Sequence, residues 1–348
     1  MTSQSPVRMA IAGMTHGHVT WILRRWQRAD VDTVAFCEPD QALVERYARE
    51  FDLPRDRLYA DLGTMLDTVR PEAVCAFGSI YDHLRVVEAC AARGIHVMVE
   101  KPLAVSGAHA HRMAALARAA GIHLITNYET TWYATTYAAR RWLEAPDGLG
   151  PLRKVVVHDG HGGPAEIGCN AEFLAWLTDP VLNGGGAVVD FGCYGANLMT
   201  WLMNGEEPDT VTAVLQTHKP ATYPRVDDEA TLILTYPQAQ AIIQGSWNWP
   251  FDRKDMALYG RDGYVVTVDE TTLHVRLRGD AAERQIELPA QPLPVSDPFA
   301  YFSAVVRGRE IVTPGNLWSL DNAVSVVKIL DAARQSARDG RTIRLTAG

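Results

Sequence analysis

The sequence predicts an α/β protein of two domains: an N-terminal doubly wound parallel sheet, then a C-terminal α/β domain with an open, mostly antiparallel sheet. Three observations predict this class. The chain has 348 residues, more than one ordinary hydrophobic core organises. Its first 127 residues alternate short, continuously apolar runs with helical segments. Its later apolar runs are longer, alternate with polar residues and are separated by short turns.

The first domain is expected over residues 1–127. Its strands are continuously apolar, which predicts a sheet buried on both faces with parallel neighbours. The segments between them are rich in helix formers, and two of them stop at Gly94 and Gly121, a typical helix end. We expect strands at 7–12, 34–37, 73–77, 96–99 and 123–126, and helices at 19–26, 42–50, 62–69, 83–93 and 108–120. Right-handed crossovers between these strands give the Rossmann architecture.

The second domain is expected over residues 128–348, with the boundary near Asn127. Period-two alternation in its apolar runs predicts an antiparallel meander with one face available. The last helix, 317–339, can pack back on the first domain. We expect further helices at 133–143 and near 198–203, an irregular glycine-rich stretch at 161–170, and strands at 155–158, 210–218, 230–236, 240–247, 254–259, 264–269, 272–278 and 284–288.

Composition excludes several classes of function. The formal net charge is −8 and no run of Lys and Arg occurs, so we expect no nucleic-acid partner. No apolar run reaches the roughly 18–20 residues of a membrane span, and no signal peptide is evident. The cysteines are odd in number and lack Cys-x-x-Cys spacing, which favours a reducing compartment: Cys37, Cys75, Cys90, Cys169 and Cys193. We therefore expect a cytoplasmic protein.

The first strand runs into a glycine-containing loop, Gly-Met-Thr-His-Gly-His, at residues 13–18. In a dinucleotide-binding fold this loop places the pyrophosphate on backbone N–H groups at a helix N-terminus. Gly13 fits the first glycine of the usual G-x-G-x-x-G pattern, whereas Thr15 and His18 occupy the second and third positions and Gly17 comes one place early. We expect cofactor contacts from Gly13, Thr15, His16 and Gly17. The alternative is an ordinary tight strand–helix turn.

Glu38 ends the second expected strand. A carboxylate at this position accepts hydrogen bonds from the adenosine ribose hydroxyls and repels a 2′-phosphate. No Arg or Lys lies next to it in the sequence, which favours NAD over NADP. The alternative is a solvated turn carboxylate.

Three further motifs follow in order. Glu-Lys-Pro-Leu-Ala at 100–104 directly follows a buried strand, with His83, a helix and Gly-Ile-His-Val at 94–97 upstream. Gly-Gly-Gly-Ala-Val-Val-Asp-Phe-Gly-Cys-Tyr occupies 184–194, and Asp-Pro-Phe at 297–299 is followed by Gly-Arg-Glu at 308–310. Together these motifs closely resemble the Gfo/Idh/MocA family, named for glucose–fructose oxidoreductase and inositol dehydrogenase.

The resemblance implies a nicotinamide cofactor, a sugar, polyol or related carbonyl compound as substrate, and homodimers or homotetramers formed through the C-terminal sheet. Lys101 matches the family's active-site lysine, and Asp190 matches the acid of its second motif. Tyr194 stands where most members carry histidine, and the Gly-Glu-Glu-Pro turn at 205–208 is similar to that of tyrosine-type members. The glycine loop departs from the family pattern, and Gly-Ser-Ile at 78–80 replaces its usual Thr-Pro-Asn. Further cofactor contacts are expected from Gly78, Ser79, His83, Glu100, Lys101 and Asn127.

Hydride transfer needs a proton moved to or from the substrate oxygen and a donor that stabilises developing alkoxide charge. We expect Tyr194 to transfer the proton, with its pKa lowered by the neighbouring Lys101 ammonium. Lys101 could instead be the base. Asp190, one helical turn before Tyr194, is expected to orient the substrate hydroxyl or Lys101. Simpler structural roles exist for all three: a strand-end turn, a helix-start acid and a packed aromatic ring.

Other residues are expected to face the cleft from the second domain. Trp132 and His161 are candidate substrate-binding residues, because aromatic faces suit sugar rings and His161 lies in the glycine-rich stretch. Tyr133, His158 and Glu166 lie in the same region. We expect no metal, because no cysteine or carboxylate cluster completes a site with the histidines His16, His18, His109 and His111.

The favoured function is therefore an NAD-dependent sugar or polyol dehydrogenase, or the matching reductase. Two alternatives stay open on the same fold. One is a glycosidase that retains NAD and uses transient oxidation to expel the leaving group. The other is a non-catalytic, nucleotide-dependent sugar sensor. The combined presence of Lys101, Asp190 and Tyr194 argues against the sensor.

Overall fold

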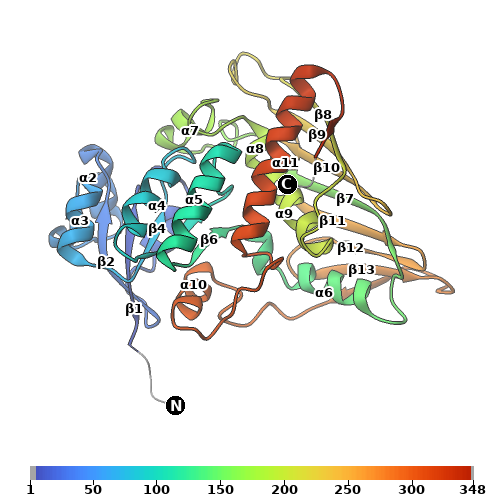
Figure 1. Ribbon diagram of the computed structural model, residues 1–348, viewed down its shortest axis with the longest axis horizontal. Helices are drawn as coiled ribbons and strands as arrows, with labels where there is room; N and C mark the ends of the chain where they lie inside the picture. The colour runs from blue at the N-terminus through green and yellow to red at the C-terminus, as the bar shows by residue number, and fades with distance from the viewer. Residues whose placement is uncertain (1–4, 346–348) are drawn as a thin grey trace.

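The computed structural model describes residues 5–345, which form two sheets with helices around them (Figure 1). The first sheet has six strands, all parallel to their neighbours, in the order β3-β2-β1-β4-β5-β6. Its strands are β1 (Val7–Ala12), β2 (Val31–Cys37), β3 (Leu58–Tyr59), β4 (Ala73–Ala76), β5 (His96–Glu100) and β6 (Leu124–Asn127). The helices between them are α1 (Val19–Leu23), α2 (Gln41–Glu50), α3 (Leu62–Val69), α4 (His83–Ala91) and α5 (Gly107–Ala120), with the 3₁₀ turn η1 (Arg55–Arg57). The predicted Rossmann sheet is confirmed.

The strand order reverses between β1 and β4, the point where ligands bind in open parallel sheets. Gly13 follows β1 here with φ +80°, and a Cβ on it would lie 2.6 Å from the backbone nitrogen of Gly78. The two strand ends therefore approach each other as backbone on backbone, which only glycine at position 13 permits.

The second sheet has nine strands in the order β14-β13-β12-β11-β7-β10-β9-β8-β15. β7 and β10 run parallel, and the other described neighbours run antiparallel, as predicted. The strands are β7 (Leu152–Gly160), β8 (Thr210–Gln216), β9 (Glu229–Thr235), β10 (Gln240–Ser246), β11 (Arg253–Gly260), β12 (Gly263–Thr267), β13 (Thr272–Leu277), β14 (Arg284–Glu287) and β15 (Ile343–Arg344). The helical elements of this half are η2 (Glu129–Trp132), α6 (Ala134–Glu144), α7 (Ala171–Leu177), α8 (Ala187–Asp190), α9 (Gly192–Leu202), α10 (Pro298–Val306) and α11 (Leu320–Asp339).

The C-terminal segment joins the two sheets. α11 packs against α5 and β6 on one side and against α9 and β8 on the other, and it crosses the middle of Figure 1. α10 lies against the first sheet, where Arg28 makes two hydrogen bonds to Asp297, of 2.9 and 3.0 Å. These contacts fix the relative position of the two sheets.

The sequence pattern misplaced one helix near this cleft. α9 begins at Gly192, whereas the expected helix began near residue 198. Every residue of α9 is buried, so the helix has no polar face and gives no amphipathic period. α10 and the two-residue strands β3 and β15 were also not expected, because such short or fully buried elements give little periodicity.

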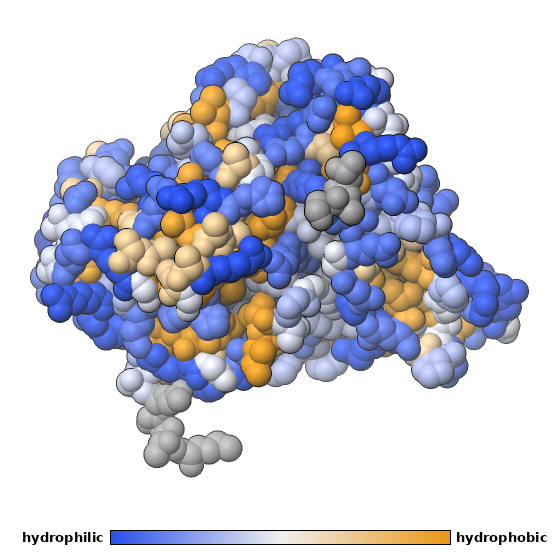
Figure 2. Space-filling model, in the orientation of Figure 1, coloured by the Kyte–Doolittle hydropathy of each residue, from blue (hydrophilic) through white to orange (hydrophobic). Residues whose placement is uncertain are grey.

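Within residues 5–345, no helix has the length and apolar character needed to cross a membrane. Figure 2 shows one face of the molecule, on which hydrophilic residues surround scattered apolar patches. The five cysteines are free thiols, and Cys37, Cys75, Cys90 and Cys193 are buried.

Candidate active site

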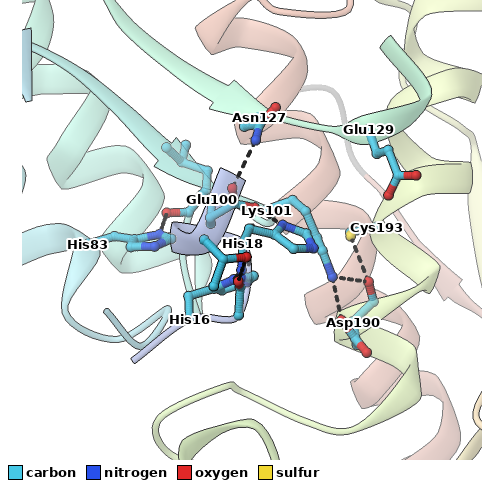
Figure 3. Close-up of polar contacts among 12 residues, drawn as sticks. His16, His18, His83, Glu100, Lys101, Asn127, Glu129, Asp190 and Cys193 are labelled. Atoms are coloured by element: carbon cyan, nitrogen blue, oxygen red, sulfur yellow. Dashed lines mark hydrogen bonds and ion pairs between the residues drawn. The ribbon is translucent and has the colours of Figure 1, made fainter. Parts of the chain in front are cut away.

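The centre of the site is a buried ion pair between Lys101, just after β5, and Asp190, at the end of α8 (Figure 3). The Lys101 ammonium donates to the Asp190 carboxylate and, at 2.9 Å, to its backbone carbonyl. The second carboxylate oxygen accepts a 2.9 Å hydrogen bond from the indole of Trp247. Lys101 and Asp190 are 6% and 5% exposed, so solvent screens the pair little. The predicted pairing of the two motifs therefore exists in space.

Burial and pairing act in opposite directions on these two groups. Burial alone would lower the pKa of Lys101, but the Asp190 carboxylate outweighs it and raises that pKa above its ordinary value. Burial likewise would raise the pKa of Asp190, and Lys101 outweighs it and lowers that pKa. Both groups are therefore charged near neutral pH, and Lys101 is an ammonium rather than a free base.

The glycine run before Asp190 positions α8. The Asp227 carboxylate accepts hydrogen bonds from the backbone nitrogens of Gly186 and Val188, at 2.9 and 2.7 Å. A Cβ on Gly186 would lie 1.8 Å from the Asp227 carbonyl oxygen. Glycine is thus required for the close approach that anchors the helix start and aims Asp190 at Lys101.

Tyr194 lies on α9 with its ring between the two domains and is 1% exposed. The ammonium groups of Lys101 and Lys254 lie 5.2 and 5.4 Å from its ring centroid. Among residues 5–345, no side chain or backbone group forms a hydrogen bond with its hydroxyl. Burial, followed by the charge of Glu129, raises the pKa of Tyr194 well above its ordinary value. The expected lowering by Lys101 is therefore wrong in direction, because Lys101 is neutralised by Asp190 and approaches the ring.

A cavity of about 310 Å³ lies beside Tyr194 in the second domain. Glu129, Tyr133, His161 and Lys254 line it, together with Phe191. Lys254 forms an ion pair with Glu129, which also accepts a 2.9 Å hydrogen bond from Tyr133. The rings of His161 and Phe191 are nearly perpendicular, with their centroids 4.9 Å apart. His161 and Tyr133 thus line a cavity, and substrate binding by His161 stays a prediction.

Three other residues expected at this cleft lie elsewhere. Trp132 packs edge-on against Trp21 at 5.2 Å and does not line the cavity. His158 is hydrogen bonded to Asp255, at 2.8 Å. Glu166 pairs with Lys219 in a loop beside Tyr223. In each case the neighbour that holds the side chain comes from a distant part of the chain, which sequence spacing does not reveal.

A second cavity, of about 290 Å³, opens at the reversal of strand order in the first sheet. Gly13, Thr15, Glu38 and Gly78 line it, as expected for an adenosine and pyrophosphate groove. Glu38 is buried and accepts hydrogen bonds from the backbone nitrogens of Met14, at 2.8 Å, and Asp40, at 3.0 Å. Each carboxylate oxygen keeps a further lone pair for a ribose hydroxyl, so the groove fits NAD.

Arg85 on α4 also lines this groove. No Arg or Lys is adjacent to Glu38 in the sequence, but the fold places Arg85 in the lining of the same groove. Arg85 is 60% exposed and its guanidinium lies 3.6 Å from the carboxylate of Asp82. Its position at the groove makes it a residue that sequence reasoning missed.

Glu100 connects the glycine loop to the end of β6 (Figure 3). One of its oxygens accepts a 2.8 Å hydrogen bond from the Asn127 amide, and the other lies 3.0 Å from Nδ1 of His18. Burial lowers the pKa of His18 to about 3, so the ring is neutral and its Nδ1–H donates. The Asn127 oxygen is buried without a partner, which leaves an acceptor for a cofactor amide or hydroxyl.

A carboxylate does lie beside the histidines of the glycine loop. The fold brings Glu100 to the imidazoles of His16 and His18, with their ligand atoms all within 4.8 Å of one another. The expected lack of a nearby carboxylate was therefore wrong, whereas His109 and His111 are not part of this cluster. Hydrogen bonds from His18 and Asn127 to Glu100 explain why the carboxylate lies beside the histidines. The absence of a metal stays a prediction.

His16, Gly17, Ser79 and His83 differ in what they can offer a cofactor. His16 is buried against Phe173 and Trp176 of α7, and a Cβ on Gly17 would lie 3.9 Å from the Phe173 ring. The Ser79 hydroxyl donates to Asp82 at 2.7 Å. His83 has no exposed surface, and its Nδ1 lies 3.1 Å from the carbonyl of Leu103. His83 therefore supports the loop after Lys101, and its other ring nitrogen has no hydrogen-bond partner within residues 5–345, so the expected cofactor contact stays a prediction.

Sequence reasoning also missed Glu129, Lys254, Trp247 and Asp159. Each lies at or just beyond the end of an apolar run, a position at which polar residues gather around a cleft. The only signal in the sequence that could have identified them is a polar residue at the end of an apolar run. The alignment of these ends depends on the order of strands in the second sheet, which the sequence pattern does not give.

Comparisons with known proteins agree with this geometry. Residues 7–128 match the family model described as "Oxidoreductase family, NAD-binding Rossmann fold", and residues 136–266 match the "GFO/IDH/MocA C-terminal domain". Trans-1,2-dihydrobenzene-1,2-diol dehydrogenase of Bos taurus is 27% identical over 286 residues, covering 81% of this chain and 79% of the relative. The enzyme of the same name from Xenopus tropicalis is 24% identical over 314 residues, covering 88% of this chain and 90% of the relative.

Solved structures show the same fold at low sequence identity. Aldose-aldose oxidoreductase from Caulobacter crescentus, complexed with glycerol, superposes with a TM-score of 0.80 at 24% identity, covering 98% of this chain and 100% of that chain. An inositol dehydrogenase homologue from Azotobacter vinelandii, complexed with NAD+, gives a TM-score of 0.84 at 19% identity, with 98% of both chains covered. Both sheets described above are thus shared with known proteins.

Proposed function

Because the chain belongs to the GFO/IDH/MocA family of oxidoreductases, we propose that it transfers a hydride between NAD and a hydroxyl or carbonyl carbon of a sugar, polyol or related carbohydrate. The observation that carries this proposal is the buried Lys101 ammonium, which lies 5.2 Å from the Tyr194 ring centroid and 5.4 Å from that of Phe191, a residue lining the polar cavity. A fixed cation in a site shielded from water stabilises a developing alkoxide strongly.

The groove lined by Gly13 and Glu38 would hold NAD, which would supply or accept the hydride when bound. Lys101 stays protonated through its pairing with Asp190, so we assign it the role of hydrogen-bond donor to the substrate oxygen. Tyr194 is the remaining proton-bearing group beside both lysines, and we assign it proton transfer. Because the pKa of Tyr194 is raised, we infer that the phenol releases its proton only when a neighbouring group accepts that proton in the same step.

The lining of the cavity supports a substrate with several hydroxyl groups. Glu129, His161 and Lys254 offer acceptors and donors, while Tyr133 and Phe191 offer ring faces. The relatives named above are dehydrogenases of a vicinal diol, and two solved neighbours contain glycerol or myo-inositol. Hydroxyl groups on adjacent carbon atoms are the feature that these compounds share with sugars.

We also propose that two or more copies associate through the open face of the second sheet. Val156, Ile242 and Ile233 are adjacent across β7, β10 and β9, and all three are half-buried on the same face. A row of aliphatic side chains on an open sheet face favours packing against another sheet.

The test is NADH formation with a panel of polyols, aldoses, trans-dihydrodiols and aryl glycosides, followed by absorbance, with the released aglycone measured in parallel. We expect NADH with at least one compound that has vicinal hydroxyls. Aglycone release without net NADH would replace the proposal with the NAD-retaining glycosidase. Bound NAD with neither product would support the sensor.

A further inference from the structure

Asp159, near the end of β7, is a buried carboxyl without a partner. It is 1% exposed, and neither of its carboxylate oxygens has a hydrogen-bond partner among residues 5–345. Val155 and Val157, on the same face of the strand, are also buried. A buried polar group left without a hydrogen-bond partner destabilises the fold, so its presence calls for an explanation.

The sheet register brings Asp159 to the active site. Asp159 lies directly opposite Lys254 on β11 and opposite Gly245 on β10. Residues directly opposite each other project from the same face, so Asp159 and Lys254 are side-chain neighbours. The Lys254 ammonium lies 5.4 Å from the Tyr194 ring centroid and is already paired with Glu129. Asp159 therefore lies next to the site but is not a member of the Lys101–Asp190 or Lys254–Glu129 ion pair.

The helix that carries Tyr194 packs closely on these strands. A Cβ on Gly245 would lie 2.7 Å from the backbone nitrogen of Gly192, and a Cβ on Gly195 would lie 2.5 Å from Ile243. Glycines on both elements thus let α9 approach β10 next to Asp159. Asp159 is one of the charges that act on the Tyr194 phenol, so the two groups lie in one buried region, and within residues 5–345 no hydrogen bond joins them.

The charged and titratable groups around Asp159 come from four parts of the fold. They are Lys254 and Asp255 of β11, Glu129 and Tyr133 around η2, Lys101 after β5, and Cys193 and Tyr194 of α9. Burial raises the pKa of Asp159 well above its usual range, and the charge of Lys254 only partly opposes this. The carboxyl therefore keeps its proton at pH values at which an exposed aspartate is ionised.

We propose that Asp159 is the proton relay partner of Tyr194. The proposal rests on the proposed hydride transfer, for which a phenol that is not readily ionised needs a proton acceptor. It makes Asp159 a positioning and relay residue that acts through Tyr194.

During oxidation, the substrate C–H bond breaks and its electron pair leaves as hydride to NAD⁺. The substrate O–H proton passes to the Tyr194 oxygen while the Tyr194 proton passes to the Asp159 carboxylate, a transfer that requires the two side chains to move within hydrogen-bond distance when substrate binds. The products are a carbonyl compound, NADH and a neutral Asp159 carboxyl. Reduction is the reverse, with Asp159 starting protonated.

The test compares Asp159→Asn with the wild type and with the control Asp280→Asn. Asn keeps the shape but exchanges no proton, whereas Asp280 lies in the β13–β14 turn, where it accepts a hydrogen bond from the Leu277 backbone. We expect Asp159→Asn to lower kcat for oxidation about 100-fold, with the KM for NAD unchanged. Wild-type oxidation should rise with pH as Asp159 loses its proton, and the variant should lack that rise. Asp280→Asn should retain wild-type turnover and pH dependence.

Two further readouts separate a relay from a structural role. Asp255→Asn removes a negative charge that raises the pKa of Asp159, so the rise should move to lower pH with kcat retained. Folding binds the Asp159 proton that the unfolded chain releases, so wild-type stability falls as pH rises above the ordinary aspartate pKa. The stability of Asp159→Asn should not fall in this way, and its melting temperature at alkaline pH should be no lower than that of the wild type.

Asp159→Asn turnover within twofold of the wild type, or an unchanged pH profile, would overturn the proposal. So would lost turnover accompanied by a large fall in melting temperature at every pH. Infrared difference spectroscopy of wild type against Asp159→Asn gives an answer without turnover, because a protonated carboxyl band should be present at neutral pH only in the wild type. If no substrate gives turnover, the proposed function fails, whereas a missing band refutes the role of Asp159 itself.

Discussion

The Lys101 ammonium donates to both the side chain and the backbone carbonyl of Asp190, a residue 89 positions later in the sequence. Lys101 follows a strand of the Rossmann sheet, and Asp190 ends a helix that lies on the second sheet. The pair therefore exists only when both domains are folded and docked. It fixes the protonation of Lys101 and the position of the cleft at the same time.

Replacing Lys101 with methionine should lower kcat by roughly 10²–10⁴-fold, because the developing alkoxide loses its charged donor. NAD affinity, measured by fluorescence titration, should change much less. Lys154→Met, at an exposed position on β7, is the matched control and should keep wild-type turnover. Near-normal kcat in Lys101→Met would remove this residue from the chemistry.

Asp190→Asn should shift the pH dependence of kcat/KM. Without the carboxylate, only the weaker effects of Cys193 and Glu100 oppose burial and the pKa of Lys101 falls, so activity that requires the ammonium should be lost at lower pH than in the wild type. Breaking a buried ion pair should also destabilise the fold by about 3 kcal/mol, measured by urea unfolding. An alkaline limb that stays at the wild-type position contradicts this coupling.

Gly13→Ala should abolish tight NAD binding and destabilise the first domain. The substitution meets the Gly78 backbone at 2.6 Å and also places alanine at φ +80°. Gly94→Ala is the control, since Gly94 has φ +67° and open space around its Cβ direction. The control should cost only about 1–2 kcal/mol, the strain of a left-handed residue. Equal losses in thermal unfolding for both variants would show that the contact with Gly78 does not matter.

Glu38→Ala should weaken NAD binding and narrow the preference for NAD over NADP. The carboxylate holds the backbone nitrogens of Met14 and Asp40 and would repel a 2′-phosphate. Any remaining NADP affinity should depend on Arg85, the cation at the same groove. Dissociation constants of both cofactors for Glu38→Ala and for Glu38→Ala combined with Arg85→Ala provide the measurement. An unaltered ratio of the two constants in Glu38→Ala would argue against ribose recognition by Glu38.

Ile242→Lys should dissociate the proposed oligomer into monomers. The residue lies between Val156 and Ile233 on the open sheet face, where a buried charge without a partner opposes association. Light scattering coupled to size-exclusion chromatography gives the mass directly. Val181→Lys, an exposed position between α7 and α8 and outside the sheet, serves as a comparison. A wild-type chain that is monomeric at all concentrations would rule out the interface.

The sequence by itself determined the Rossmann sheet and the mostly antiparallel second sheet, and it predicted Lys101 and Asp190 as site residues. These features depend on local patterns: continuous apolar strands, glycines at strand ends, and two motifs of fixed spacing. The start of the α9 helix was not predicted, because a fully buried helix shows no alternation of polar and apolar faces. Its start at Gly192 depends on the close packing of Gly192 and Gly195 against β10, which is a tertiary contact.

The tertiary structure decided the electrostatics of the site. The direction of the Tyr194 pKa depends on burial, and the Asp190 carboxylate engages the lysine that was expected to act on the phenol. The meeting of Glu100 with His18 and the alignment of Asp159 with Lys254 depend on strand order and register. A pKa reflects the distance and solvent exposure of every nearby charge, and those are set by parts of the chain far apart in sequence.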